Sequence, residues 1–201
     1  MAAAGGDAGF VNGAPIGEGF EDFRAAVGWE PEAVGAGGEG GGGGRWMTVA
    51  GFGALLSERS SRMTFPALRN FRTGRLRGWR RVFAHRGGAP FRHIERVETK
   101  EMASLSCEPH AGSELVVALM DVPLEEPSWA DFVVREHEYR FVAVAVDGLP
   151  RPAVLCAAWT DEDYRRVRCP DAEYHRRYGQ YGIDRIWRDD LLPARLYLRH
   201  W

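Results

Sequence analysis

The stretch V-A-G-F-G-A-L-L, residues 49–56, closes an apolar run that begins at Trp46 and breaks on two glycines bracketing Phe52. A short apolar run that ends at glycine is typical of a buried β-strand that stops at a turn. Glycine can adopt positive φ and lets another backbone or a ligand approach closely. We therefore expect a strand leading into a turn whose amides face outward and can hold an anion such as a carboxylate. The same glycines also suit a turn that only packs beneath Phe52.

The composition predicts a water-soluble globular protein. The chain has 201 residues, of which 45% are hydrophobic, and its formal net charge is −2. That length suits one domain with additional sequence. No apolar stretch approaches the roughly 18 residues that span a bilayer, and the start of the chain is neither a secretory signal nor an arginine-rich transit peptide. We expect a cytoplasmic protein whose cysteines, Cys107, Cys156 and Cys169, are reduced thiols.

A glycine-rich segment divides the chain into two parts. Residues 35–44 contain eight glycines and predict a flexible linker. Few apolar side chains precede it, so we expect residues 1–44 to be a disordered Gly/Ala-rich extension. Phe20, Phe23 and Val27 share one face of a possible short helix there, which either docks on the main domain or a partner, or forms only transiently. Residues 46–201 are expected to form one domain.

The rest of the chain has more strand signals than helix signals. Six segments rich in valine or aromatics are bounded by Gly, Pro or Asp, as strands are: residues 45–52, 78–85, 95–107, 114–122, 139–147 and 151–159. Helical patterns cover residues 55–63, 128–139 and 171–192. This balance predicts an α+β fold with a small mixed β-barrel or curved sheet and a few flanking helices.

Several familiar active-site motifs are absent from the sequence. It has no complete G-x-G-x-x-G fingerprint, no Gly-Lys-Ser/Thr phosphate loop and no G-x-S-x-G nucleophile elbow. Its six histidines form neither H-x-x-x-H nor H-E-x-x-H. We therefore expect no nucleotide-binding site of these types and no metal site.

In their order, the remaining features resemble the γ-glutamylcyclotransferase superfamily. Its members carry a strand that ends in a Y-G-S-L-like loop and a glutamate placed shortly before a later strand. The corresponding loop here is F-G-A-L, residues 52–55, and the later segment is R-E-H-E-Y-R-F-V-A-V-A-V, residues 135–146. The resemblance extends over residues 46–200. Phe52 and Ala54 replace the tyrosine and serine of the family loop, so two hydroxyl groups are missing while the backbone amides remain.

The resemblance implies an enzyme that cyclises a γ-glutamyl compound to 5-oxoproline and releases an amine or peptide, without a cofactor. Glu136 occupies the family's catalytic glutamate position, and Glu138 is its rival because the gap to Tyr139 is shorter than usual. Substrate contacts are expected from Tyr139 and from Gly51, Phe52, Gly53, Ala54 and Leu55. The substrate is a small γ-glutamyl molecule such as glutathione, a γ-glutamyl amino acid or a γ-glutamylamine.

Plainer interpretations apply to the same residues. Glu136 also fits a surface ion pair with Arg135 or Arg140. Glu138 and His137 are expected at the surface, whereas Tyr178 and Tyr181 are expected to pack in the core. The number of subunits is left open by the sequence.

Two other classes of function compete with the enzyme. Residues 62–100 hold eleven basic side chains interleaved with aromatics, a pattern that fits RNA or DNA binding. The alternative that we favour is that these arginines form the wet side of a strand and balance acidic residues elsewhere. The third possibility is a catalytically silent relative that binds a small acid or a protein.

Overall fold

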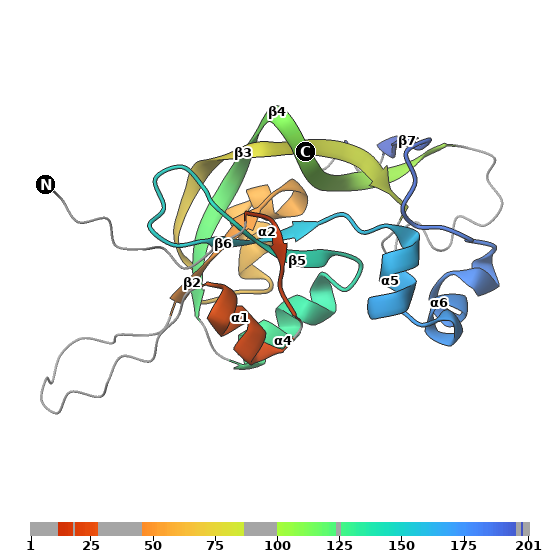
Figure 1. Ribbon diagram of the computed structural model, residues 1–201, viewed down its shortest axis with the longest axis horizontal. Helices are drawn as coiled ribbons and strands as arrows, with labels where there is room; N and C mark the ends of the chain where they lie inside the picture. Colours follow the sequence, from red (N-terminus) through yellow and green to blue (C-terminus); the bar gives the residue numbers. More distant parts are fainter. Residues whose placement is uncertain are drawn as a thin grey trace, which may run out of the picture.

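The structure of the protein is a computed structural model, shown as a ribbon in Figure 1. It describes residues 12–17, 19–27, 46–86, 100–123, 126–195 and 198. The glycine-rich segment, most of the chain before it, and the start of the strand expected over residues 95–107 lie outside the described residues. In the part of the chain that the structure describes, no helix is long and apolar enough to cross a membrane.

Short helices stand between groups of strands along the described part of the chain. The strands are β1 (Ala14–Pro15), β2 (Trp46–Gly51), β3 (Arg69–His85), β4 (Glu101–Pro123), β5 (Arg140–Val144), β6 (Ala153–Ala157) and β7 (Leu192–Pro193). The α-helices are α1 (Phe20–Ala26), α2 (Glu58–Arg62), α4 (Glu126–Arg135), α5 (Asp161–Val167) and α6 (Asp171–Arg177). Two 3₁₀ turns, η1 (Gly53–Leu56) and η2 (Gly179–Tyr181), complete the elements.

All seven strands belong to one mixed sheet. Its order is β1-β5-β6-β2-β4-β3, with β7 added beside β4. β2 is antiparallel to β4 and parallel to β6, and β6 is antiparallel to β5. Within the described residues β1 and β3 are not paired with each other, so the sheet is open and curved (Figure 1). The expected α+β class is confirmed, and of the two expected shapes the curved sheet is the observed one.

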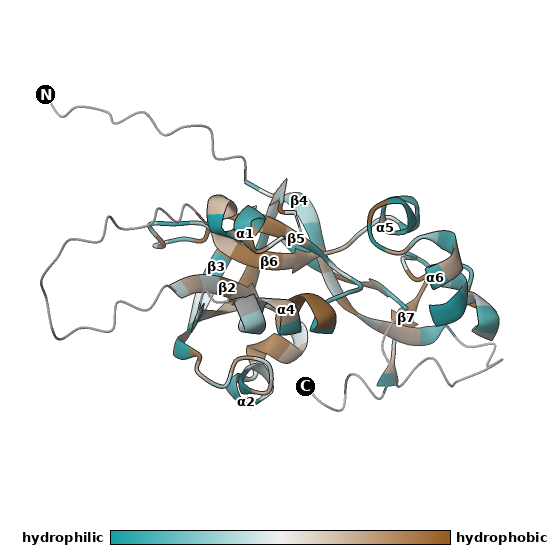
Figure 2. Ribbon diagram, turned by 90° about the horizontal axis from the view of Figure 1, so that it is seen from below, coloured by the Kyte–Doolittle hydropathy of each residue, from teal (hydrophilic) through white to brown (hydrophobic). Residues whose placement is uncertain are grey.

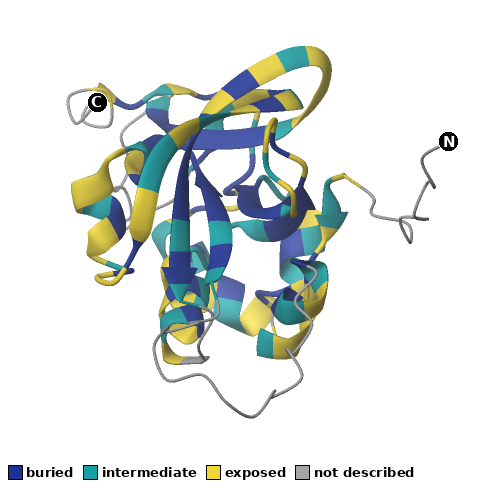
Figure 3. Cartoon of the chain, turned by 90° about the vertical axis from the view of Figure 1, so that its left-hand side faces the viewer, coloured by how far each residue is buried: buried dark blue, intermediate teal, exposed yellow. Residues whose placement is uncertain are grey.

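The long pair β3 and β4 arches over the rest of the sheet. Segments expected as separate strands over residues 95–107 and 114–122 are joined in β4. The register of the ladder shifts between Arg77 and Trp79, at Gly78, which has a φ of 78°. Such a bulge bends a strand without ending its pairing. The ladder therefore continues where the sequence pattern suggested a break. Buried and exposed stretches follow one another along the arch (Figure 3): residues 102–107 and 117–120 of β4 are buried, and residues 109–112 between them are exposed.

The sheet core is an apolar cluster between the sheet and the helices α1 and α4. β5 and β6 are hydrophobic along their length (Figure 2). Phe132 of α4 lies 5.3 Å from Phe141 of β5 and 5.2 Å from Phe65, measured between ring centroids. Phe23 of α1 lies edge-on to Phe141 at 5.4 Å. Burying an aromatic side chain of this kind contributes roughly 1.5–3 kcal/mol, so these rings hold α1 and α4 against the sheet.

The disordered N-terminal extension is a wrong prediction where the structure describes it. Ala14 and Pro15 form β1 and pair with β5, and Phe23 is fully buried in the sheet core. The apolar face of α1 has a surface to cover, which local composition does not reveal. Of the two alternatives for this helix, docking on the main domain is the observed one.

The C-terminal third is built around tyrosines. The tyrosine cluster, defined by Tyr164, Tyr174 and Tyr178, is buried together with Ile183 and Ile186 and forms a second core at the α5 and α6 end of the sheet (Figure 1). Core packing is confirmed for Tyr178, whereas Tyr181 is only partly buried.

The long helix expected over residues 171–192 is shorter than the pattern suggested. α6 ends at Arg177, and Gly182 adopts a φ of 72° after η2. The carboxylate of Asp161 accepts hydrogen bonds from the amides of Ile186 and Trp187 at 2.9 and 3.0 Å. These distant contacts satisfy the backbone outside a helix, so Ile183, Ile186 and Trp187 are buried without helical structure.

Candidate functional site

The sheet topology brings two distant segments to one edge. Because β2 and β6 are parallel and pair Ala50 with Leu155, both strands end at this edge. β5 runs the other way and pairs Arg140 with Ala157, so the residues just before β5 lie there too. The rings of Phe52 and Tyr139 meet edge-on with centroids 6.2 Å apart. The glycine loop (residues 51–55) and the acidic turn (residues 136–139) are therefore neighbours, as the sequence predicted.

The glycine loop is held tightly from inside. A Cβ atom at Gly51 would lie 2.5 Å from Leu55 Cβ and 3.1 Å from Met120 Cε, so only glycine fits. Gly53 has a φ of 63°, in the left-handed region that favours glycine. Phe52 is 7% exposed and packs in the sheet core. The turn thus does pack beneath Phe52, as the plainer interpretation held.

The backbone of the glycine loop still offers donors. Its backbone hydrogen bonds run from Leu55 N to Phe52 O at 3.3 Å and from Ser57 N to Ala54 O at 3.2 Å. Among the described residues, no acceptor is found for the amides of Gly53 and Ala54. Gly53 is buried and Ala54 is exposed. Neighbouring amides of this kind suit an anion, because a buried N–H without an acceptor costs free energy.

Glu136 follows the last residue of α4 and is largely buried. Its side chain is 13% exposed, and Arg135 Nε donates a hydrogen bond to its Oε1 at 2.9 Å. Arg135 also donates to the carbonyl of Ser60 at 3.2 Å and to the hydroxyl of Thr64, in and after α2. The arginine therefore fastens Glu136 to the segment that follows the glycine loop. The expected pair with Arg135 exists, but its carboxylate end is largely buried.

Burial dominates the electrostatics of Glu136. Loss of hydration raises the pKa of its carboxyl above the usual value, and the charge and hydrogen bond of Arg135 oppose that shift in part. The charge of His85 also lowers the pKa and that of Glu138 raises it. A carboxyl group whose pKa is raised by burial is the usual form of a general acid and base that works near neutral pH.

Glu138 is not the surface charge that we expected. Its side chain is 12% exposed, and its Oε1 accepts a hydrogen bond from Tyr178 at 2.6 Å. Its Oε2 lies 3.2 Å from Nε2 of His85, although not at the angle of a straight hydrogen bond. The expectation was wrong because both partners come from distant parts of the chain, and nothing near Glu138 in the sequence announces them.

His137 also departs from its expected exposed position. It is half-buried, and its Nδ1 lies 3.0 Å from the hydroxyl of Tyr164. Burial, together with the charges of Arg177 and Arg168, lowers its pKa to about 4. The imidazole is therefore neutral at neutral pH.

Tyr139 lies between the glycine loop and a histidine that the sequence analysis did not single out. Its hydroxyl donates to the carbonyl of Leu105 at 2.9 Å and lies 3.2 Å from Nδ1 of His85. His85 is 2% exposed, stacks on Trp187 at 4.4 Å, and has the Ser104 hydroxyl 2.8 Å from the same Nδ1. A lone histidine at the end of an arginine-rich strand carries no local signal, so only its three-dimensional neighbours identify it.

A cavity of about 930 Å³ lies beside this edge but does not include the candidate residues. Its walls come from β5, α5 and the segment after β6, and they include Arg140, Trp159 and Arg168. Neither Glu136 nor any residue of the glycine loop lines it. We therefore place the site on the loop and turn, where the chemistry lies, and not in this cavity. Among the described residues, no group of three or more His, Cys, Asp or Glu side chains could hold a metal ion.

Comparison with solved structures finds similar chains of low identity. One is named "Gamma-glutamyl cyclotransferase", with a TM-score of 0.42 and 11% identity over 78% of this chain and 98% of that one. The uncharacterised protein loc79017 from Homo sapiens has a TM-score of 0.44 and 12% identity over 77% of this chain and 97% of its own. The protein At5g39720.1 from Arabidopsis thaliana has a TM-score of 0.41 and 14% identity, covering 60% of this chain and 81% of that one.

No family model matches the chain, and no curated protein matches it. The TM-scores all lie below 0.5, so these similarities carry no argument about activity.

Proposed function

We propose that the protein is a γ-glutamylcyclotransferase-like enzyme in which Glu136 is the general acid and base. The observation that carries this proposal is the placement of a buried carboxyl with a raised pKa at the same sheet edge as a loop with unsatisfied amides. The resemblance of residues 46–200 to the superfamily supports it independently of that geometry.

The chemistry needs one proton-transferring group. In a γ-glutamyl compound the α-amine and the γ-carbonyl carbon belong to one chain, so binding in a folded form brings them together. The ionised Glu136 takes a proton from the α-ammonium, and the freed amine forms the new C–N bond of 5-oxoproline. As the old C–N bond breaks, Glu136 returns this proton to the leaving nitrogen. The second proton that the ring nitrogen loses is also transferred to the leaving group, so the amine departs as an ammonium ion. Such proton transfer is worth about 10²–10⁴-fold in rate.

The glycine loop would hold the substrate's α-carboxylate. The amides of Gly53 and Ala54 need only the backbone, so the missing hydroxyls at positions 52 and 54 do not remove this contact. Gly51 keeps the loop folded against Met120. A carboxylate held by backbone amides requires no lysine or arginine.

The experiment is an assay of the purified protein with glutathione, γ-glutamyl amino acids and γ-glutamylamines, read as 5-oxoproline by mass spectrometry. We expect release from at least one of them and a loss of 10²-fold or more in Glu136→Gln. Glu162→Gln, at an exposed position on α5, is the matched control and should retain full activity. Unchanged release by Glu136→Gln would remove the proposed base. No release by the native protein from any compound would favour a silent binding relative.

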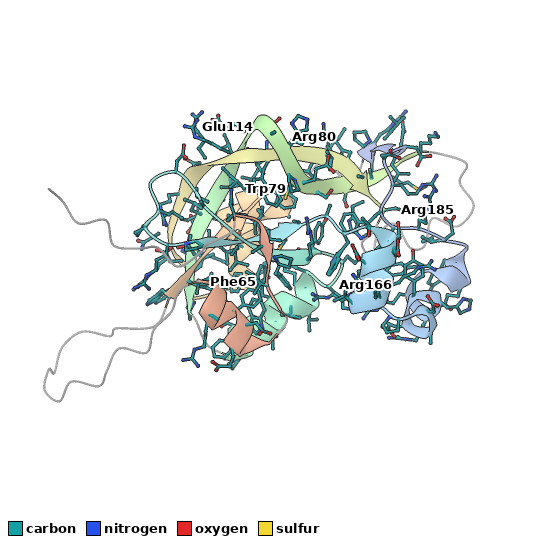
Figure 4. All side chains as sticks on the ribbon, viewed as in Figure 1. Phe65, Trp79, Arg80, Glu114, Arg166 and Arg185 are labelled. Atoms are coloured by element: carbon teal, nitrogen blue, oxygen red, sulfur yellow. The ribbon has the colours of Figure 1, made fainter. Side chains whose placement is uncertain are left out.

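The nucleic-acid alternative has less support. The arginines of β3 are largely paired, since Arg75 contacts Glu114, Arg77 contacts Asp147 and Arg80 contacts Glu108. Figure 4 shows Arg80 on the outer side of the arch and Trp79 turned inward. Trp79 is thus buried, at 2% exposure, and cannot stack on a base. The paired arginines of β3 fit the alternative that they form the solvent-exposed side of a strand.

A further inference from the structure

A continuous chain of polar side chains runs behind the acidic turn. It links His137 to Tyr164 at 3.0 Å, Tyr164 to Tyr178 at 3.2 Å, Tyr178 to Glu138 at 2.6 Å and Glu138 to His85 at 3.2 Å. Its members come from α5, the end of α6, the acidic turn and the end of β3. None of these groups was given a role in the proposed reaction.

Burying these linked polar side chains costs free energy unless each of them is hydrogen-bonded. Tyr164 and Tyr178 are fully buried, and His85 is 2% exposed. Polar groups removed from water lose hydration that only good hydrogen bonds offset, and an apolar core of the same volume would fold as well. A histidine and a carboxylate placed together in such a setting act on any other titratable group nearby through a low effective dielectric.

We infer that His85 and Glu138 are positioning residues that set the charge state of Glu136, with Tyr178 holding Glu138 in place. The inference rests on the proposed function for its consequence in catalysis, but not for the electrostatic coupling itself. Glu138 is two residues from Glu136 on the same turn. Tyr178 donates a hydrogen bond to its carboxylate at 2.6 Å, and Nε2 of His85 lies 3.2 Å from the other carboxylate oxygen. A proton on His85 favours the ionised form of Glu136, whereas the negative charge of Glu138 opposes it.

Other groups also face this pair. On the sheet side these are Ser104 of β4 and Tyr139 of the acidic turn, both beside His85 Nδ1. On the helix side the charge of Glu138 is felt by His137, Tyr164 and Cys169. Arg135 acts on Glu136 directly. Substitution of His85 or Glu138 leaves Arg135 in place, so the direct partner of Glu136 is the same in both variants.

Substitution of His85 and substitution of Glu138 should shift the titration midpoint of Glu136 in opposite directions. His85→Gln removes the side chain whose charge favours the ionised form of Glu136 and leaves Glu138, so Glu136 should hold its proton to higher pH. Glu138→Gln removes a negative charge, so Glu136 should lose its proton at lower pH. The double variant should return towards the native midpoint. A purely structural role for either residue predicts loss of stability in both variants and no such opposition.

The test is a ¹³C NMR titration of the glutamate side-chain carboxyls, in which the Glu136 resonance is the one lost in Glu136→Gln. We expect its midpoint to rise by about one pH unit in His85→Gln and to fall in Glu138→Gln. Glu162→Gln and His110→Gln, both at exposed positions, are the matched controls and should leave it unchanged. Midpoints that move in the same direction in both variants, or in neither, overturn the inference.

Activity gives the second measurement. The acidic limb of the pH–rate profile for 5-oxoproline release should move to higher pH in His85→Gln and to lower pH in Glu138→Gln. Opposite NMR shifts without any 5-oxoproline from the native protein would reject the proposed function and keep the coupling. If His85→Gln or Glu138→Gln does not fold, Tyr178→Phe replaces it, because loss of its hydrogen bond makes the Glu138 carboxylate easier to protonate. It should lower the Glu136 midpoint, and an equal or higher midpoint overturns the inference.

Discussion

The sheet core and the tyrosine cluster bury different kinds of side chain. The sheet core joins carbon surfaces, with Phe132 touching Phe65, Trp129 and Phe141. The tyrosine cluster buries hydroxyls that each find a polar partner, such as Glu138 for Tyr178. Packing alone can therefore stabilise the first region, whereas the second also fixes the position of charges. The difference indicates that one region supports the candidate site and the other sets its electrostatics.

The largest effect on stability is expected from breaking the sheet core. Phe132→Ala should lower the free energy of unfolding by about 3–5 kcal/mol, because it removes a fully buried ring and leaves a cavity between α4 and β5. Urea unfolding followed by circular dichroism measures this. Val134→Ala, on the same helix and 76% exposed, is the control and should stay within about 0.5 kcal/mol of the native protein. Equal losses in both variants would mean that α4 is not anchored through Phe132.

A smaller loss is expected from Tyr178→Phe, which keeps the ring and removes the hydroxyl. The variant leaves the buried carboxylate of Glu138 without its 2.6 Å donor, so we expect a loss of about 1.5–3 kcal/mol. In the Glu138→Gln background the same change should cost less, since the charged acceptor is already gone. Equal costs in the two backgrounds would show that the hydroxyl acts through Tyr164 and not through Glu138.

The smallest effect should appear in the acid sensitivity of the tyrosine cluster. Burial lowers the pKa of His137 to about 4 from an ordinary value near 6.5, so the unfolded chain binds more protons than the folded one between these values. The contribution of the neutral His137 to the free energy of unfolding is complete above pH 6.5 and is lost as the pH falls towards 4. In His137→Gln the free energy of unfolding should depend less on pH between these two values.

Urea midpoints of the native protein and His137→Gln at pH 5 and pH 7.5 measure that difference. We expect the native protein to lose more stability than the variant on going to pH 5. Phe132→Ala should show the native pH dependence, because the sheet core holds no titrating group at that position. A His137→Gln curve parallel to the native one would place the acid sensitivity elsewhere in the molecule.

Much of the site was predictable from short stretches of sequence. The glycine bracket around Phe52 is a local requirement, since the close approach of Leu55 and the positive φ of Gly53 involve neighbours in the chain. The strands next to it also announce themselves, because runs of apolar residues between breakers predict buried strands. The neighbourhood of the glycine loop and the acidic turn followed from the family resemblance, and the sheet order gives it a physical basis.

The tertiary structure alone decided the surroundings of the two glutamates. Glu136 and Glu138 stand in one short polar stretch, and local sequence marks both as surface charges. Arg135 shelters the first, while the second is enclosed by Tyr178, forty positions later in the chain, and by His85 from β3. The sequence by itself determined the glycine loop and the apolar strands beside it, because those depend on backbone preference and apolar spacing. Burial and charge at the acidic turn depend on which distant side chains fold over it, and that is a property of the packed structure.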